Sequence, residues 1–341
     1  MRVAVLFNPD AGSNMKFRGI GAVLSKRLKG HEVLTCRGSF GKLYLPDAAE
    51  TYGDVRSGYR DSITDMTSSL VRHAPELFIC VGGDGLASYA ADTLITNGCV
   101  VPIMGVAGGT ANVGPIIAVS PEMLEHFDPK KLAVSSIGAI HVNNGCNHLG
   151  YAFNDVIIGN TFLGTVNGKT ANLSVETLLK KNEKKVVEAP SDEITADTFK
   201  ITKNGSQVKY SIERPAQIIA SPLEVDNFYG RAITGILCYS AHMPLKAAIG
   251  LYDEVIVKMH SHETAMEHFT KVEHLLFGQG DHVSISGLSG NGHIIIDGNP
   301  YLREDEVISL EYMPNLLNIA KPVIQCGLPP TTQRMYLLPR M

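Results

Sequence analysis

Short apolar runs separated by amphipathic stretches fill the first third of the chain. Four of these runs predict buried strands, at residues 3–7, 31–36, 78–81 and 100–104. Between them, apolar residues recur at helical spacing and predict helices at residues 17–28, 61–73 and 87–95. Strands and helices that alternate in this way predict a parallel, doubly wound sheet with right-handed crossovers.

The hydrophobic pattern changes near residue 136, where alternating segments and hairpin turns begin. Asn204-Gly205 is a strong hairpin signal between predicted strands at residues 198–202 and 207–212. A second hairpin is expected to turn at Asn167-Gly168, and a further turn is expected at residues 297–300. This part of the chain therefore predicts a mostly antiparallel, sandwich-like β structure.

The two patterns divide the 341 residues into three parts. Residues 1–135 are expected to form an α/β domain. Residues 136–312 are expected to form a β-rich domain that contains two helices, at residues 175–185 and 263–276. Residues 313–341 form a C-terminal tail whose pattern is too weak to assign, and its return to the first domain is left open.

Composition narrows the class of protein. A hydrophobic share of 44% and a mean hydropathy of +0.05 are too apolar for a disordered chain. With a net charge of −4 and a pI of about 6.3, the chain lacks the basic character of a nucleic-acid-binding protein. No apolar run is long enough to span a bilayer, and the six cysteines include no CxxC pair. We therefore expect a cytoplasmic protein with reduced cysteines that binds neither nucleic acid nor membrane.

Three polar, glycine-rich loops each follow a predicted strand of the first domain. They contain Asn8 and Gly12, then Gly82, Gly83, Asp84 and Gly85, and finally Gly109, Thr110 and Asn112. Because the carboxyl ends of parallel strands lie at one edge of a sheet, these loops are expected to line one crevice. Glycine lets backbone N–H groups approach a phosphate closely, so the crevice is a candidate nucleotide site.

Asp84 is the unexpected residue among these glycines. A carboxylate repels phosphate, so its position fits a group that takes a proton from a hydroxyl, accepts a hydrogen bond from a ribose, or holds Mg²⁺. The alternative is a tight strand-to-helix turn in which Asp84 caps the next helix. Three such loops in succession favour a binding site over an ordinary turn.

These loops resemble, in order and approximate spacing, those of the superfamily of NAD kinases, diacylglycerol kinases and sphingosine kinases. Within it, the Gly109-Thr110-Ala111-Asn112 loop and the chain length look most like the NAD kinase-like proteins encoded with acetoin-catabolism genes, the AcoX type. Further along, Asn154-Asp155 resembles the Asn-Glu motif of NAD kinases, and Asp297-Gly298 resembles a late Asp-Gly turn of the family. The resemblance implies a Rossmann-like first domain, a β-sandwich-like second domain and a cleft between them.

The resemblance also implies roles for single residues. Asp84 would be the catalytic carboxylate that orients or deprotonates the acceptor hydroxyl. ATP with Mg²⁺ would serve as phosphoryl donor, and a homo-oligomer is expected. The nucleotide would contact Asn8, Gly12, Gly82, Gly83, Gly85, Gly109, Thr110 and Asn112, whereas the acceptor would contact Asn154, Asp155 and Asp297.

The sequence departs from the family pattern at three places. Leu86 stands where the family motif has a threonine, and the Thr-Gly-Ser-Thr segment of NAD kinases has no good match. The continuation after Asn112 also lacks the residues usual in lipid kinases. Three functions therefore stay open: a kinase acting on NAD or another metabolite hydroxyl, a nucleotide-binding regulatory protein without activity, and a diacylglycerol-type lipid kinase.

Two other groups of polar residues were weighed against these motifs. His260, His262, Glu263, Glu267 and His268 form a cluster, but a polar helix face explains them better than a metal, so no metal-binding residues are predicted. Arg56, Tyr59 and Arg60 lie in a long loop, either as a mobile phosphate clamp or as ordinary surface residues.

Overall fold

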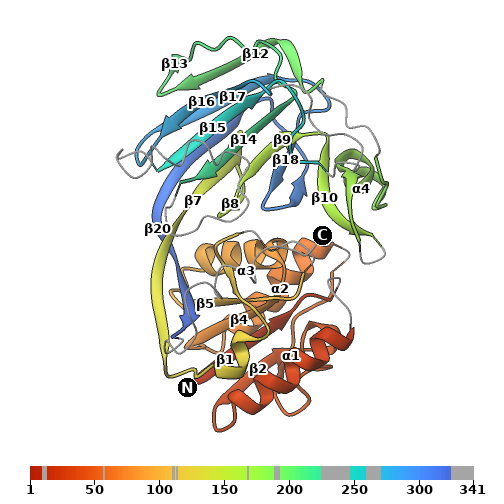
Figure 1. The fold of residues 1–341 in the computed structure, drawn as a ribbon, viewed down its shortest axis with the longest axis vertical. Coiled ribbons are helices and arrows are strands. Elements are labelled where there is room, and N and C mark those ends of the chain that lie inside the picture. Colours follow the sequence, from red (N-terminus) through yellow and green to blue (C-terminus); the bar gives the residue numbers. More distant parts are fainter. Residues whose placement is uncertain are drawn as a thin grey trace.

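A computed structural model describes most of the chain (Figure 1). The described residues are 1–9, 14–56, 58–109, 112, 114–166, 169–187, 193–223, 246–258 and 270–323.

A parallel sheet organises the N-terminal part of the chain. Its strands lie in the order β3-β2-β1-β4-β5-β6, and all neighbours in this series are parallel. The bounds are β1 (Arg2–Phe7), β2 (Glu32–Cys36), β3 (Ala49–Thr51), β4 (Leu77–Gly82), β5 (Ile103–Ala107) and β6 (Ile117–Val119). This order is that of a Rossmann-like sheet, in which ligands bind at the carboxyl ends of the strands.

Helices cover both faces of this sheet because the strands are apolar on both sides. Helix α1 (Asn14–Arg27) packs Phe17 and Leu24 against Val3, Val5 and other residues of one face. Helices α2 (Tyr59–Val71) and α3 (Asp84–Thr96) cover the opposite face, where Leu6 and Phe78 lie. Two short 3₁₀ turns, η1 (Gly38–Phe40) and η2 (Met123–His126), complete this part. The predicted doubly wound α/β fold is confirmed.

Two long strands carry the same sheet into the C-terminal part (Figure 1). Strands β7 (Leu132–Asn144) and β20 (Ile308–Pro322) pair antiparallel along most of their length. Near its end, β20 also pairs with β5 through Ile319 and Ile103. The antiparallel extension is completed by β8 (Asn147–Ala152), β17 (His282–Leu288), β12 (Thr195–Lys203) and β13 (Ser206–Gln207).

A second, six-stranded sheet packs on this extension. Its order is β16 (Val272–Phe277), β15 (Ala247–Tyr252), β14 (Gln217–Pro222), β9 (Val156–Gly159), β18 (His293–Ile296) and β19 (Asn299–Tyr301). Alternate residues face opposite ways: Ile158 belongs to the core shared with the first sheet, whereas Ile157 belongs to the outer core. That outer core is closed by hairpin β10 (Thr161–Val166) and β11 (Lys169–Ser174) with helix α4 (Val175–Lys181). The predicted β-sandwich-like architecture is confirmed.

Several local predictions were wrong. Residues 272–276 form strand β16 rather than the end of a helix, since their backbone pairs with β15. The rest of that predicted helix lies mostly outside the described residues. Strand β5 begins at Ile103 instead of residue 100, because Val100 is 80% exposed. Of the strand expected at 207–212, only Gln207 is in a strand, the two-residue β13 (Ser206–Gln207).

The C-terminal tail also contains a strand that its sequence did not predict. Strand β20 runs to Pro322, and its register shifts between Met313 and Leu317, which interrupts the alternation of apolar residues. The division at residue 136 falls inside β7, and the two-domain description stays a prediction.

Candidate active site

The loops that follow β1, β4 and β5 lie together at the carboxyl edge of the parallel sheet. The Asn8 backbone N–H donates to the Val81 carbonyl at 2.9 Å. The N–H groups of Gly108 and Gly109 both donate to the Gly82 carbonyl, at 2.7 and 3.0 Å. The structure thus places Asn8, Gly82 and Gly109 in one cluster, whereas Gly12 and Thr110 lie outside the described residues.

Close backbone packing explains the glycine at position 109. A Cβ added to Gly109 would lie 2.9 Å from the Cα of Gly83, closer than side-chain carbons approach. The loops after β4 and β5 therefore touch through their backbones, which keeps side chains out of this edge of the site.

Asp84 is the first residue of helix α3, with Gly83 at the N-cap. Its Oδ2 atom accepts a hydrogen bond from the Gly114 N–H at 3.1 Å. A Cβ on Gly114 would lie 2.9 Å from Asp84 Oδ1 and 3.6 Å from the Cβ of Asn154. A single glycine thus separates the Asp84 carboxylate from Asn154 of the β-rich part.

Leu86, which stands at the position of the threonine in the resembling motif, is a core residue. Its side chain is 1% exposed and belongs to the core beneath the loop. Its Cδ2 atom would lie 2.9 Å from a Cβ on Gly82. At position 86 the chain therefore has an apolar core residue beneath the loop that follows β4.

Asn154 and Asp155 follow β8 and form the opposite wall of the site. Asn154 is 4% exposed, and its Nδ2 donates to Asp155 Oδ2 at 2.9 Å. Within the described part of the chain, the buried Oδ1 atoms of Asn154 and Asn112 accept no hydrogen bond. Buried acceptors are almost always satisfied in native proteins, so these two oxygens are the atoms of the site that still need a donor from outside the described residues.

Asp297 lies in the turn between β18 and β19 and is 5% exposed. Its carboxylate accepts three backbone N–H groups, from Phe153 at 3.0 Å, Asn154 at 2.8 Å and Asp155 at 3.0 Å. Burial raises the pKa of Asp297, and these three hydrogen bonds, together with one from the Ser88 side chain, only partly offset that effect. The carboxylate thus orients the loop that carries Asn154 and Asp155, and its direct contact with an acceptor stays a prediction.

Two polar residues of the site escaped the sequence analysis. Asn299 is 7% exposed, and its Nδ2 donates to the Gly85 carbonyl at 3.0 Å. The Ser221 hydroxyl on β14 donates to the Asn154 carbonyl at 2.6 Å. Asn299 follows Asp297 by two residues, which was the one signal in the sequence that could have drawn attention to it.

The other candidates have partners elsewhere. Arg60 donates to the Leu149 carbonyl at 2.8 Å and lies over the Tyr301 ring, with Arg60 Cζ 4.8 Å from the ring centroid. Arg56 pairs with Asp65. These contacts fit structural roles better than a mobile clamp. The histidine cluster at residues 260–268 lies outside the described residues, and no group of three or more His, Cys, Asp or Glu side chains in the described part could hold a metal.

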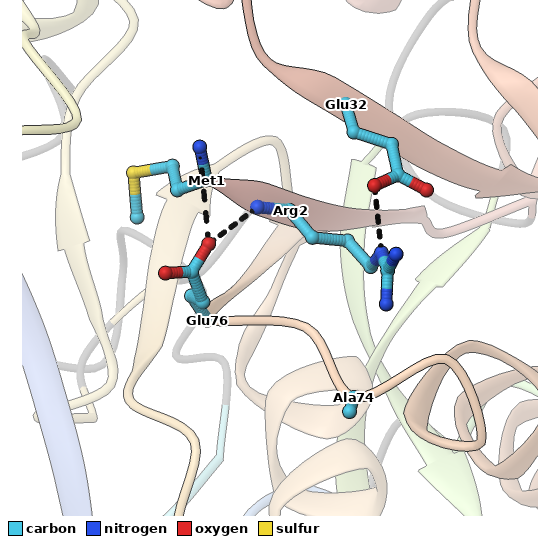
Figure 2. A pocket seen from close by; sticks show the side chains of 5 residues that line it. All are labelled: Met1, Arg2, Glu32, Ala74 and Glu76. Carbon is cyan, nitrogen blue, oxygen red and sulfur yellow. Dashed lines mark hydrogen bonds and ion pairs between the residues drawn. The ribbon is translucent and has the colours of Figure 1, made fainter.

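A pocket on the opposite, amino edge of the sheet lacks these features (Figure 2). It is lined by Met1, Arg2, Glu32, Ala74 and Glu76. Figure 2 shows its charges paired with each other, with Arg2 Nε 2.9 Å from Glu32 Oε2 and the Arg2 backbone N–H donating to Glu76 at 2.6 Å. The charged groups of this pocket are therefore satisfied by one another.

Comparison with known proteins supports the fold. No protein-family model matches the chain. An uncharacterized protein of Archaeoglobus fulgidus is 25% identical over 261 residues, 75% of this chain and 78% of that protein. A putative diacylglycerol kinase from Bacillus anthracis superposes with a TM-score of 0.54 at 14% identity, over 93% of this chain and 96% of that one. Another crystal structure of a putative diacylglycerol kinase from that organism gives 0.52 at 13% identity, over 93% and 95%.

An NAD kinase from Archaeoglobus fulgidus, solved in complex with ATP, superposes at a TM-score of 0.49 with 14% identity, over 94% of each chain. The chain thus has the fold of the diacylglycerol kinase-like structures over nearly its whole length. In the part of the chain that the structure describes, no helix is both long and apolar enough to cross a membrane.

Proposed function

We propose that this protein is an ATP-dependent kinase that phosphorylates a hydroxyl group of a small molecule. The observation that carries the proposal is the position of Asp84. Asp84 begins helix α3, and Gly114 lies next to both its carboxylate and Asn154 of the β-rich part. A carboxylate placed between a helix N-terminus and a polar loop can accept the proton of a hydroxyl that attacks a phosphoryl group.

The surrounding groups support this assignment of roles. The N-terminus of α3 presents backbone N–H groups and the positive end of the helix dipole, which suit a phosphate. The unsatisfied amide oxygens of Asn112 and Asn154 suit hydroxyl or amino groups of the substrates. Phosphoryl transfer requires mainly positioning and charge neutralisation, which these groups supply without a covalent intermediate.

Mg²⁺ fits the same set of residues. The Asp84 carboxylate and the amide oxygens of Asn112 and Asn154 are hard oxygen ligands of the kind that Mg²⁺ prefers. Bound there together with the nucleotide, the ion would neutralise phosphate charge. Mg²⁺ is usually held by one or two protein oxygens together with substrate phosphates, so this sparse set suits an ion that arrives with ATP.

The sequence resemblance makes NAD the first acceptor to test, in a protein of the AcoX type, which we expect to be a cytoplasmic homo-oligomer. A lipid acceptor is the second candidate. It is favoured by the superpositions on two structures described as putative diacylglycerol kinases.

Turnover and nucleotide binding together test the proposal. Purified protein is assayed for ADP release from Mg·ATP with NAD, with a panel of hydroxylated metabolites and with diacylglycerol in detergent micelles. We expect one acceptor to support turnover, and Asp84→Asn to lower kcat by about 10²–10⁴-fold, the range of general base catalysis. The Kd for Mg·ATP, measured by calorimetry, should change much less.

Two results would contradict the proposal. Wild-type turnover in Asp84→Asn would show that this carboxylate is not the base. Tight Mg·ATP binding without turnover on any acceptor would instead favour a nucleotide-binding regulatory protein.

A further inference from the structure

We propose that the β18–β19 turn, residues 297–299, sets the distance between the two walls of the site, and that Asn299 is a positioning residue for Asp84. The inference rests on the proposed function for its catalytic consequence, but its structural part stands alone. Both walls are bonded to this one turn: Asp297 contacts the loop that carries Asn154 and Asp155, and Asn299 contacts the first turn of helix α3.

We call the loop of residues 153–155 the acceptor wall. Its contact with the turn is rigid because hydrogen bonds run in both directions between them. Asp297 accepts three N–H groups of residues 153–155, and its own N–H donates to the Asp155 carbonyl at 3.0 Å. Behind the turn, β18 pairs with β9, which begins directly after Asp155, through Ile296 and Val156. The turn and the acceptor wall therefore move as one unit.

We call the start of helix α3, with Asp84 and Gly85, the nucleotide wall. Its contact with the turn joins residues 214 positions apart in the chain. Asn299 Nδ2 donates to the Gly85 carbonyl at 3.0 Å, next to Asp84. A Cβ at Gly85 would lie 2.6 Å from Asn299 Oδ1, so only glycine allows this approach. Gly85 thus permits a contact with the β-rich part in addition to its place in the nucleotide loop.

A second contact reinforces the first along the same two elements. Tyr301 of β19 packs edge-on against Tyr89 of α3, with ring centroids 6.2 Å apart. Residues 299 and 301 point to the same side of a strand, and residues 85 and 89 lie on the same face of a helix. Two strand residues span about 6.6 Å and four helical residues span about 6.0 Å, so the two pairs of contacts match in spacing.

This arrangement gives Asn299 a specific effect on the chemistry. Gly85 follows Asp84 directly, so a shift of the Gly85 carbonyl also moves the Asp84 carboxylate. Phosphoryl transfer depends on the placement of the base, and a misplacement of about 1 Å can cost on the order of 10²-fold in rate. Asn299 therefore acts on the reaction through Asp84.

Hydrogen exchange measured by mass spectrometry on the full chain tests the structural part without any ligand. Asn299→Ala removes the contact, and Asn299→Asp keeps the shape but replaces the donor with an acceptor. We expect either variant to raise amide exchange over residues 84–89 by about tenfold or more, the response of a region whose local opening has become easier. The inference is overturned if exchange over residues 84–89 is unchanged in both variants.

Asn144→Ala is the matched control. Asn144 is also a buried asparagine that holds a turn, but it bonds residues 304, 305 and 307. It should lower overall stability and leave exchange over residues 84–89 at the wild-type level. If Asn144→Ala raised amide exchange over residues 84–89 equally, general destabilisation would explain the effect of Asn299, and the inference would be overturned.

A kinetic measurement with Mg·ATP and the acceptor identified above separates this inference from the proposed function. We expect Asn299→Ala to lower kcat by about 10–100-fold while KM for ATP changes by less than about threefold. An unchanged kcat would overturn the positioning role. If the wild type neither binds nor turns over ATP, the proposed function fails, while the exchange experiment still decides whether the turn connects the two walls.

Discussion

Replacing Asp297 with asparagine tests how much its buried carboxylate contributes to stability through its bonds to the loop of residues 153–155. Oδ1 accepts the N–H groups of Asn154 and Asp155, and Oδ2 accepts that of Phe153. An asparagine has one oxygen, so its best orientation keeps two of these bonds and turns its NH₂ group toward the Phe153 N–H. One buried hydrogen bond is then lost and its donor is left unsatisfied, which costs about 1–3 kcal/mol. At a pH where the Asp297 carboxyl is ionised, the free energy of unfolding should fall by that amount.

The pH dependence of this difference provides a sharper test. Burial raises the pKa of Asp297 despite its three hydrogen bonds. A raised folded-state pKa means that the wild type binds the proton more tightly when folded, so this group's contribution to stability is lost as the pH rises above about 4, the unfolded value, through the folded pKa. The asparagine side chain does not titrate, so the variant lacks this pH-dependent contribution. The difference between wild type and Asp297→Asn should therefore be largest at acid pH and should shrink as the pH rises through the folded-state pKa.

The assay is urea unfolding followed by far-UV circular dichroism at several pH values, since the chain contains no tryptophan. Asp281→Asn is the matched control. Burial raises the pKa of Asp281, but hydrogen bonds from Asn204, Lys203 and Gly278 together lower it. Its effect on stability should therefore grow as the pH rises. A difference for Asp297→Asn that also grows with pH would refute our reasoning, because it would mean that the three hydrogen bonds outweigh burial.

Two further predictions concern His141 and Leu86, which lie outside the proposed set of substrate contacts. His141 donates to or accepts from His148 at 2.9 Å, and His148 in turn bonds Asp92 at 2.7 Å. Burial and the neighbouring His148 lower the pKa of His141, so stability should fall as the pH drops from about 6.5 toward that lowered value. His141→Gln should reduce the difference in melting temperature between pH 7.5 and pH 5.5, and an unchanged difference would contradict this assignment. Leu86→Thr should lower the free energy of unfolding by about 2–4 kcal/mol, because a hydroxyl enters an apolar core. Higher turnover without destabilisation would contradict the inward position of residue 86.

Much of the fold could be predicted from local patterns. The apolar runs and helical spacing near the start of the chain identified the three helices and four strands of the parallel sheet, because each element must bury a face of its own periodicity. The short strands β3 and β6 were missed, since three residues are too few to show a period. The sandwich was predicted from hairpin turns such as Asn204-Gly205, which lies between β12 and β13. Residues 272–276 were mistaken for a helix because a short apolar run with mixed spacing is ambiguous until its partner strand is known.

Part of the candidate site could also be predicted from the sequence, and part could not. The loops at Asn8, Gly82 and Gly109 could be assigned to one edge from sequence, since every parallel strand of such a sheet ends there. The environment of Asp297 could not, because burial decides whether a carboxylate faces a cleft or bonds backbone N–H groups inside the fold. Asn299 lies in the turn predicted at residues 297–300, but the turn motif does not indicate a contact with helix α3. Neither Asn299 nor Ser221 could be assigned to the site, because each contacts its partner only in the packed tertiary structure.

By itself, then, the sequence determined the order of the elements, the chemistry at the strand ends and the acidic residue among the glycines. These properties depend on near neighbours in the chain, whose spacing is set by the periods of helix and strand. Only the tertiary structure decided how far Asp84 lies from Asn154 and which turn holds them apart. That distance depends on contacts such as the one between Gly85 and Asn299, across 214 positions, which the packing of the β-rich part against helix α3 creates.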